Sequence, residues 1–418
     1  MFDQMRPSPA DETVSTGSAA AVTGGGRRRI LIGTDTYPPD VNGAGYFTQR
    51  LATGLFDRGN EVHVITVSDT GKPYRHVVDG VTVHRLKSVS ARVYPNQRIV
   101  LPGATVAAVD RIFDRVRPDV THMQSHFVVG RACLRVSKRR RLPVMATNHF
   151  MPEPLLHHVP VPQKVRDWAA TRAWNDAARV FSRADYVSTP TPLAARHFAD
   201  RGFNGDIDAI SCGIDLSRFR PREGEAASVR AHFGLPDRKT VVFVGRLDQE
   251  KRIDQLIRAV PALRRRQDAQ LVIAGVGPYW ERLKTLAADL GVSAYVHLLG
   301  FVSDEDLPLV YHTGDVFAIA SVAELQSIVT LEAMASGLPV VGADAVALPH
   351  LIKNGRNGYL FDPGDVEGLG ARLEAILASP RDLESMGAES RKMADEHEHG
   401  RSLERFEAVY DRLCGVRR

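Results

Sequence analysis

Two glutamates, Glu324 and Glu332, form the pattern with the most chemical content in this chain. Small and apolar residues follow the second one as far as Gly337, and Pro339 lies just beyond, which predicts a helix that ends there. The first carboxylate would lie where a loop meets the helix N-terminus, whose N–H groups can receive a phosphate. The second, about two turns later, could reach a ribose. The pair suits a nucleotide-sugar, and two surface glutamates on an amphipathic helix are the alternative.

A pair of cations, Arg246 and Lys251, follows a buried-type strand that is predicted at 240–245. Residues in this position lie at the carboxyl edge of a parallel sheet, where ligand clefts form. Two cations there could hold a diphosphate and stabilise it as it departs. Solvated surface charges would explain the same residue types, and the nearby glutamate pair favours the diphosphate.

Glycines and backbone groups at other loop positions offer further ligand contacts. Gly245 and Gly275 each end a predicted strand, and the second opens a Gly-Val-Gly turn that permits close backbone approach. A plain tight turn would need the same glycines. Backbone groups at Phe301 and Val302 could read a base edge, although a strand end before a capped helix explains them equally. Gly43 lies in a loop ahead of a helix, which suits an anion.

Polar side chains also end two strands predicted in the first half of the chain. Gln124 and His126 follow the strand at 120–123, and His149 follows the strand at 142–147. Polar residues at the carboxyl ends of parallel strands belong to clefts, so both histidines are catalytic candidates. Each histidine taken alone is better explained by a structural or hydrogen-bonding role.

The elements that position these side chains alternate between strand and helix, which is typical of parallel α/β sheets. In the first half, strands are predicted at 28–33, 61–67, 120–123, 142–147 and 186–188, with helices at 46–58, 131–140 and 163–182. In the second half, strands are predicted at 240–245, 270–275, 296–299, 316–319 and 339–342. The fold class is therefore α/β, with two tandem Rossmann-like domains and a ligand cleft between them.

The length of 418 residues also suits two domains rather than one core. A strand at 210–215 is expected to lead into the crossing between them. The predicted segments are a disordered tail at 1–26, a first domain at 27–220, a second domain at 221–400 and a C-terminal helix at 401–418. In folds of this kind a terminal helix often crosses back to the first domain, which periodicity alone does not decide.

Composition limits the class of protein. No run of 18 apolar residues occurs, so no transmembrane helix is expected, and residues 1–26 lack a signal-peptide block. Cys133, Cys212 and Cys414 have no metal or disulfide spacing, which fits a reducing cytosol. No histidine, cysteine and carboxylate cluster has zinc spacing, and Arg246 and Lys251 already supply positive charge, so no metal or other cofactor is expected.

Basic residues gather in two predicted helices of the first domain. They are Arg135, Lys138, Arg139, Arg140 and Arg141, then Lys164, Arg166, Arg172 and Arg179. The second helix also carries Trp168 and Trp174, and basic charge with aromatics suits an anionic membrane surface. A solvated helix end and core tryptophans are the alternative. A nucleic-acid partner is not expected, since no aromatic platform accompanies the basic run. The expected location is the cytoplasm or the inner face of the membrane.

Together these motifs resemble the retaining family-four glycosyltransferases, which adopt the GT-B fold of two Rossmann-like domains. The resemblance covers nearly everything from residue 28 to the C-terminus. Its pieces are the Pro-Pro-x-x-x-Gly loop, Gly245-Arg246 to Lys251, the Gly275 turn, Gly300-Phe301-Val302, and Glu324 to Glu332 with Ala-Met-Ala-Ser-Gly-Leu-Pro-Val-Val. Gln326 looks like the diacylglycerol and phosphatidylinositol branch of the family.

The resemblance implies roles at the matching positions. Arg246 and Lys251 would bind the donor diphosphate, Glu324 the hexose hydroxyls and Glu332 the ribose. The other implied donor contacts are Gly43, Gly245, Gly275, Phe301, Val302, Gln326, Ser327 and Ile328.

Three departures from the commonest family pattern occur. Leu325-Gln326-Ser327 replaces a frequent Gly-Phe-Gly, and Gly43-Ala44-Gly45 replaces a frequent Gly-Gly pair. Gln124 stands at a strand end where many members carry histidine, so the sugar-contacting histidine stays open between His126 and His149.

The activity implied is transfer of a hexose from UDP-glucose or GDP-mannose to an acceptor hydroxyl, either of a small molecule or of a lipid at a membrane surface. The family suggests retention of the anomeric configuration through an oxocarbenium-like species, without a covalent enzyme intermediate. Two rivals are a nucleotide-sugar epimerase of the same fold and a nucleotide-sugar-binding protein without catalysis.

Overall fold

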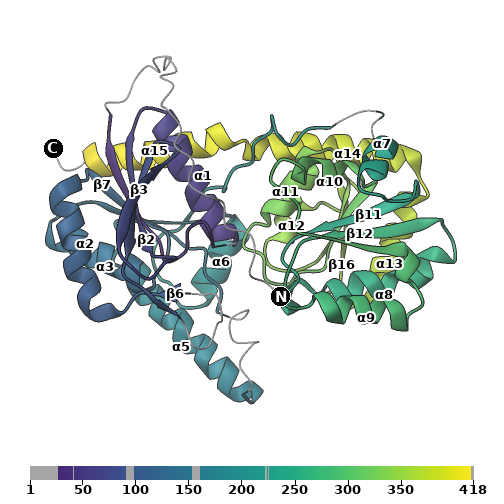
Figure 1. Cartoon of the computed structure of the whole chain (residues 1–418), viewed down its shortest axis with the longest axis horizontal. Coiled ribbons are helices and arrows are strands. Elements are labelled where there is room, and N and C mark those ends of the chain that lie inside the picture. The colour runs from purple at the N-terminus through teal and green to yellow at the C-terminus, as the bar shows by residue number, and fades with distance from the viewer. Residues whose placement is uncertain are drawn as a thin grey trace.

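The computed structural model describes residues 27–40, 42–90, 98–152, 161–221, 224 and 226–415. The tail predicted at 1–26 lies outside these residues. The described chain forms two separate α/β units side by side, each a mainly parallel sheet flanked by helices (Figure 1). The predicted fold class is confirmed, and the predicted boundary at residues 220–221 falls between the two sheets.

The first sheet has eight strands in the order β10-β9-β8-β7-β1-β2-β4-β3, and only the edge pair β3 and β4 is antiparallel. Its strands are β1 (Arg29–Gly33), β2 (Glu61–Val67), β3 (Tyr74–Val78), β4 (Val81–Leu86), β7 (Val120–Met123), β8 (Val144–Thr147), β9 (Tyr186–Thr189) and β10 (Asp208–Ala209). Strands β5 (Val89–Ser90) and β6 (Arg98–Ile99) pair with each other. Burial of nearly every residue in the central strands explains their continuous apolar runs.

The helices of this domain are α1 (Gly43–Asp57), α2 (Pro102–Val116), α3 (Val128–Arg139), α5 (Gln163–Phe181) and α6 (Pro192–Asp200). Helix α1 begins three residues before the predicted start because Asn42 caps it. The side-chain oxygen of Asn42 accepts a hydrogen bond from Gly45 N at 2.8 Å. The loop after β1 therefore leads directly into a capped helix.

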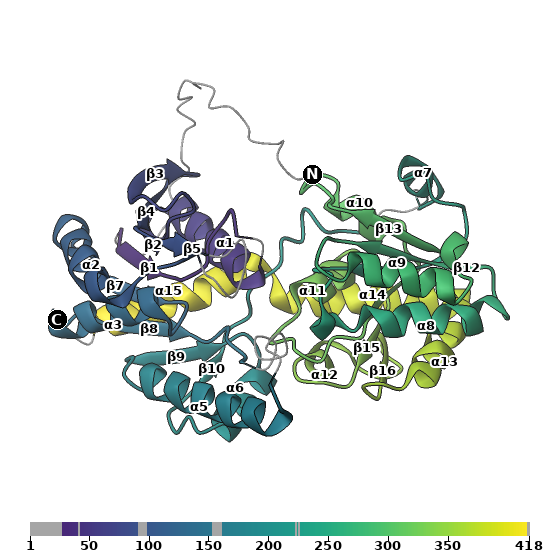
Figure 2. The same cartoon turned by 60° about the horizontal axis from the view of Figure 1, so that its bottom comes forward.

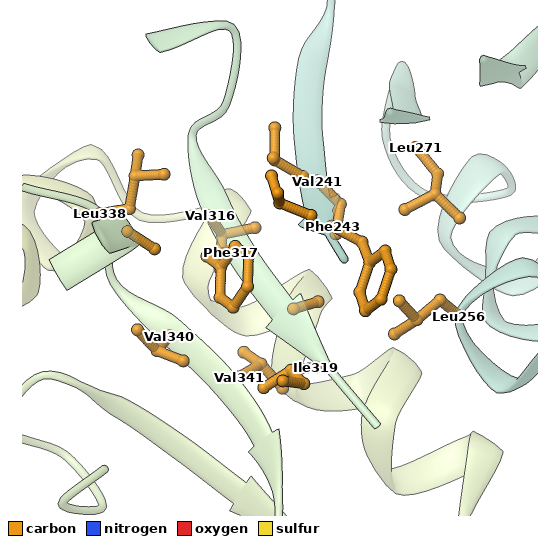
Figure 3. Packing of buried hydrophobic residues seen from close by; sticks show 14 of the residues in the cluster. Val241, Phe243, Leu256, Leu271, Val316, Phe317, Ile319, Leu338, Val340 and Val341 are labelled. Atoms are coloured by element: carbon orange, nitrogen blue, oxygen red, sulfur yellow. The ribbon is translucent and has the colours of Figure 1, made fainter. Parts of the chain in front are cut away.

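The second sheet has six parallel strands in the order β13-β12-β11-β14-β15-β16. They are β11 (Lys239–Val244), β12 (Ala269–Ala274), β13 (Val296–Gly300), β14 (Val316–Ile319), β15 (Val340–Ala343) and β16 (Gly358–Phe361). The helical segments are α7 (Ala226–His232), η1 (Gln249–Lys251), α8 (Ile253–Arg264), α9 (Trp280–Asp289), η2 (Ser293–Tyr295), α10 (Leu307–His312), α11 (Ile328–Ala335), α12 (Leu348–Leu351), α13 (Val366–Leu377), α14 (Pro380–Ala394) and η3 (Asp395–His397). Phe243 of β11 and Phe317 of β14 pack among aliphatic side chains in its core (Figure 3).

The chain crosses between the domains twice. The prediction of a strand at 210–215 is wrong. Strand β10 ends at Ala209, and Ile214 makes only an isolated bridge to Glu398. The reason is that these residues leave the sheet to meet the returning chain. Helix α15 (His399–Gly415) then packs on the first domain (Figure 2). Its Phe406 and Tyr410 side chains are buried in the core of that domain. The return of the terminal helix is thus confirmed.

Candidate functional site

Lys251 and Glu324, which are 73 residues apart in sequence, form an ion pair in the second domain. The Lys251 Nζ atom donates to Oε1 of Glu324 at 2.6 Å, and both side chains are largely buried. Lys251 ends η1, which follows β11, and Glu324 lies in the loop after β14, the strand beside β11. The order of the sheet therefore brings the two residues together at one edge, as adjacent parallel strands require.

Arg246 lies in the same loop after β11 but has different partners. Its guanidinium donates to Glu250 at 2.7 Å and lies 3.6 Å from Asp248. Asp248 also caps η1 by accepting from Gln249 N at 2.7 Å. Two local carboxylates thus neutralise Arg246, whereas Lys251 is paired with a residue from the loop after another strand.

Glu332 lies one helical turn inside α11 and is almost completely buried. Its carboxylate accepts a hydrogen bond from the hydroxyl of Tyr311 on α10 at 2.6 Å. Burial raises the pKa of Glu332, and the Tyr311 hydrogen bond works in the opposite direction. One carboxylate oxygen is therefore fixed by the fold, in a position that suits a single directed contact.

The first residues of α11 meet the first domain. Ser327 has φ +66° and provides no side-chain cap to the helix, since its hydroxyl pairs with Thr330 at 2.8 Å. Ile328 packs against the core of the first domain. The N-terminus of α11 is thus held at the boundary between the domains, in the place where an anion would be received.

The side chain of Gln326 bonds to the segment that crosses between the domains. Its side-chain oxygen accepts from Cys212 N at 2.6 Å, and its Nε2 donates to Ser211 Oγ at 2.7 Å. Both ends of the amide therefore bond to the crossing segment, and Gln326 is almost fully buried. The donor contact expected from Gln326 stays a prediction, and these bonds show that its side chain also contacts the crossing segment.

The glycines predicted to contact the donor lie in different structural surroundings. Gly245 and Gly275 have φ +151° and +145°, and a Cβ on Gly275 would lie 1.9 Å from the Gly245 carbonyl oxygen. Packing between the two loops alone thus demands glycine at 275. At Gly43 an added Cβ would meet nothing within 4 Å, so the backbone there borders open space. Directly after β13, Phe301 is exposed and Val302 is half-buried.

In the first domain, Gln124 lies between two histidines. Its Oε1 accepts from His149 Nε2 at 2.9 Å, and its Nε2 lies 3.1 Å from Nε2 of His122. His122 also pairs with Tyr410 and Thr147, each at 2.7 Å. Burial lowers the pKa of His149 to about 4 and that of His122 to about 3, so both rings are neutral at pH 7.

His126 lies apart from this group. Its ring packs against Phe127 and Phe150 with centroids 4.4 and 4.5 Å away. Its Nδ1 atom is buried without a hydrogen-bond partner among the described residues, and burial lowers its pKa to about 4. Of the two histidine candidates, His149 is the one that the structure joins to the polar group at the strand ends.

Four residues that contact the site belong to none of the sequence motifs. They are Tyr311, Thr191, Ser211 and His397. Thr191 Oγ1 donates to the Leu325 carbonyl at 2.9 Å, across 134 residues. Only Tyr311 carried a usable hint, because a tyrosine in an apolar helix needs a partner for its hydroxyl when it is buried.

The predicted membrane features are only partly exposed. Trp174 is 1% exposed and belongs to the core, which corrects its proposed interfacial role, whereas Trp168 is 64% exposed. Lys138 and Arg139 of α3, and Arg140 at its C-cap, are paired with aspartates. Across the described ranges, no helix has the length and apolar character needed to cross a membrane.

Among the described residues, carboxylate, histidine and cysteine side chains do not gather into a metal site. No group of three or more of them is placed to hold an ion in the part of the chain that the structure describes. The charged groups at the second-domain strand ends are instead paired with one another.

Comparison with known proteins gives matches over both halves of the chain. The family "Glycosyl transferases group 1" matches residues 227–393, and "Glycosyltransferase Family 4" matches residues 41–218. The two matches correspond to the second and first α/β units and together cover most of the sequence.

Curated relatives and a solved structure extend this result. The chain is 28% identical to alpha-monoglucosyldiacylglycerol synthase of Streptococcus pneumoniae over 358 residues, which is 84% of this chain and 79% of the relative. It is 36% identical to a GDP-mannose-dependent phosphatidylinositol monomannoside mannosyltransferase of Mycolicibacterium smegmatis over 225 residues, 52% of this chain and 59% of the relative. Sucrose-phosphate synthase from Thermosynechococcus elongatus has a similar fold, with TM-score 0.75, 21% identity and coverage of 93% and 99%.

Proposed function

The chain belongs to the glycosyltransferases with the GT-B fold, and we propose that it moves a hexose from a nucleotide-diphosphate sugar to a hydroxyl of a lipid or glycolipid. Two relatives in the comparison are named for diacylglycerol and phosphatidylinositol mannoside products or acceptors, which supports a lipid acceptor. The donor would be of the UDP-glucose or GDP-mannose type.

The ion pair between Lys251 and Glu324 is the observation that carries the proposal. A buried carboxylate at a strand end suits the hydroxyls of a hexose, and a cation 2.6 Å away suits the phosphate attached to that hexose. Helix α11 begins four residues after Glu324, and its N-terminus adds N–H donors. The loops after two adjacent strands, β11 and β14, can therefore recognise a sugar phosphate at both of its ends.

The proposed reaction retains the anomeric configuration. The bond between the sugar C1 and the phosphate oxygen breaks, and the acceptor oxygen bonds to C1 on the same face. The acceptor proton passes to the departing phosphate oxygen, so no enzyme nucleophile is required. Lys251, Arg246 and the α11 N-terminus would stabilise the charge that accumulates on the phosphate.

The same groups lead us to propose that transfer needs no metal ion. Lys251, Arg246 and the α11 N-terminus would oppose the charge of a diphosphate once the two cations turn from their carboxylate partners toward the donor. Activity should therefore persist after dialysis against EDTA and should not rise on addition of Mg²⁺ or Mn²⁺. Loss of activity with EDTA and recovery with either ion would contradict this part of the proposal.

We also propose that helix α5 contacts an anionic membrane surface. Its exposed face carries Val165 and Trp168, and the Arg172 guanidinium lies 5.7 Å from the Trp168 ring. Lys164 is exposed on the same helix, which projects from the body of the first domain (Figure 1). Aromatic and basic side chains together suit the boundary between lipid headgroups and acyl chains.

A donor and acceptor panel tests the function. The purified protein is incubated with UDP-glucose or GDP-mannose and with diacylglycerol or phosphatidylinositol in mixed micelles, and products are identified by mass spectrometry. Formation of a glycolipid is the expected result. An epimerised donor without glycolipid would favour the epimerase instead, and donor binding without any product would favour a binding module.

Vesicle flotation tests the membrane contact. Wild type should float with vesicles that contain anionic lipid, and Trp168→Ser should float several-fold less. Val77→Ser is the matched control, since Val77 is 65% exposed on edge strand β3. Equal flotation of both variants, or no binding by wild type, would contradict a role for α5.

A further inference from the structure

The two crossing segments, 210–215 and 395–399, are bonded to each other where they pass between the domains. Ile214 N donates to the His397 carbonyl at 2.8 Å, and His399 N donates to the Ile214 carbonyl at 3.0 Å. Gly213 has φ +74°, and a Cβ there would lie 2.9 Å from the His399 ring. These close contacts make the two segments a single connection between the domains.

Gln326 joins this connection to the loop that carries Glu324. Its amide accepts from Cys212 N at 2.6 Å and donates to Ser211 Oγ at 2.7 Å. The same hydroxyl lies 2.9 Å from Nδ1 of His397, so one residue of the loop is tied to both crossing segments through Ser211.

The protonation of this small network is defined by its surroundings. Burial lowers the pKa of His397 to about 4, with His350 as a second cause, so the ring is neutral at pH 7. The Ser211 hydroxyl already accepts from Gln326 and from Gly213 N at 3.1 Å. It can therefore donate to Nδ1 of His397, and each of these polar groups has a partner.

Neighbouring residues tie the same loop to both domains. Glu324 is paired with Lys251 of the second domain. The Leu325 carbonyl accepts from Thr191 at the start of α6 in the first domain. Three consecutive residues are thus attached to the second domain, the first domain and the crossing segments, in that order.

We propose that Gln326 is a positioning residue that sets the location of Glu324 according to the relative position of the two domains. The proposal rests on the proposed function, in which Glu324 contacts the transferred hexose. A change in the angle between the domains would move the crossing segments, and the Gln326 amide would transmit that movement to the loop. Sugar placement would then be correct in only one arrangement of the domains, which prepares the donor for transfer after both substrates are bound.

Steady-state kinetics and binding on Gln326→Leu test this role. Removal of both hydrogen bonds should lower kcat by 10- to 100-fold and change the dissociation constant of UDP or GDP, whichever binds wild type, by less than threefold. Gln326→Glu keeps an acceptor for Cys212 N and should lose less activity. A nucleotide affinity that falls as much as kcat would show a direct donor contact and overturn the proposal.

Gln270→Leu is the matched control for a merely structural effect. Gln270 is as buried as Gln326 and donates to Pro236 O at 2.8 Å and to Thr240 at 3.0 Å, within the second domain. Both variants should melt at a lower temperature, but only Gln326→Leu should lose turnover at a temperature where both are folded. Equal turnover in the two variants would overturn the positioning role.

A double-mutant cycle and hydrogen exchange complete the test. If Gln326 acts through Ser211, Ser211→Ala should add less than threefold to the kcat loss of Gln326→Leu, whereas independent effects would multiply and contradict the proposal. Hydrogen exchange at 210–215 and 324–327 should accelerate together in Gln326→Leu and stay unchanged in Gln270→Leu. This last readout does not need activity, so failure of the proposed function and failure of the coupling remain distinguishable.

Discussion

The carboxyl ends of the two sheets carry opposite chemistry. In the second domain the strand ends carry ion pairs, Lys251 with Glu324 and Arg246 with Glu250. In the first domain His122, Gln124 and His149 form a neutral hydrogen-bonded group. Fixed charges suit a diphosphate donor, and neutral polar groups suit an acceptor hydroxyl without competing for the phosphate. We propose that each domain is matched to the charge of its own substrate.

Acid should destabilise the first domain more than the second, and this is the largest effect expected. Burial lowers the pKa of four of its histidines to about 3 or 4, namely His84, His122, His126 and His149. In the unfolded chain these histidines are protonated near pH 6.5, whereas in the folded chain they stay neutral. Their contribution to the free energy of unfolding is therefore fully present above pH 6.5 and is lost as pH falls toward 4. Each histidine would withdraw up to about 2 kcal/mol at pH 5.

Hydrogen exchange at pH 7 and pH 5 measures this difference, because it reports each domain separately. The first domain should lose protection more than the second. His149→Asn should make the dependence of stability on pH shallower by up to one proton, about 1.4 kcal/mol per pH unit. Equal loss of protection in the two domains would contradict the assignment of neutral, buried rings to the first.

Removal of a charge from the second domain should have the next largest effect. Lys251→Ala should lower kcat by about 100- to 1,000-fold and change donor affinity much less, because the phosphate charge grows in the transition state. Arg246→Ala should cost about tenfold, since Arg246 is 45% exposed and two local carboxylates already neutralise it. Steady-state kinetics with melting temperatures as a folding check would measure both. An equal loss of donor affinity and turnover in Lys251→Ala would count against the role.

Strand positions were predictable from the sequence because short-range residue patterns determine them. Buried parallel strands read as short apolar runs between turn residues, so β2, β7 and β14 begin and end where expected. Strand order then follows from the helical crossovers, which place Lys251 and Glu324 at the same edge. The cation and the carboxylate were both expected at the cleft, although their direct pairing was not.

Side-chain partners across long separations were not predictable. The amide of Gln326 bonds to the crossing segment 115 residues away, and the Glu332 carboxylate bonds to Tyr311 on another helix. Nothing in the local pattern distinguishes a glutamine that faces a ligand from one that faces the backbone of a neighbouring segment. Trp168 and Trp174 illustrate the same limit, because six positions on one helix separate an exposed ring from a buried one.

Glu332 offers the finest test of the comparison, because no cation among the described residues is in direct contact with this buried acid. If it binds a ribose, Glu332→Gln should weaken nucleotide binding about tenfold and change kcat less than threefold, since the ribose does not react. Tyr311→Phe removes only the hydrogen bond that fixes one carboxylate oxygen, so its effect should be smaller and in the same direction. Calorimetric titration with UDP and GDP would measure both variants. If nucleotide affinity stayed unchanged in Glu332→Gln, Glu332 would be a structural partner of Tyr311, and the donor side of the comparison would rest on the loops that carry Arg246, Lys251 and Glu324.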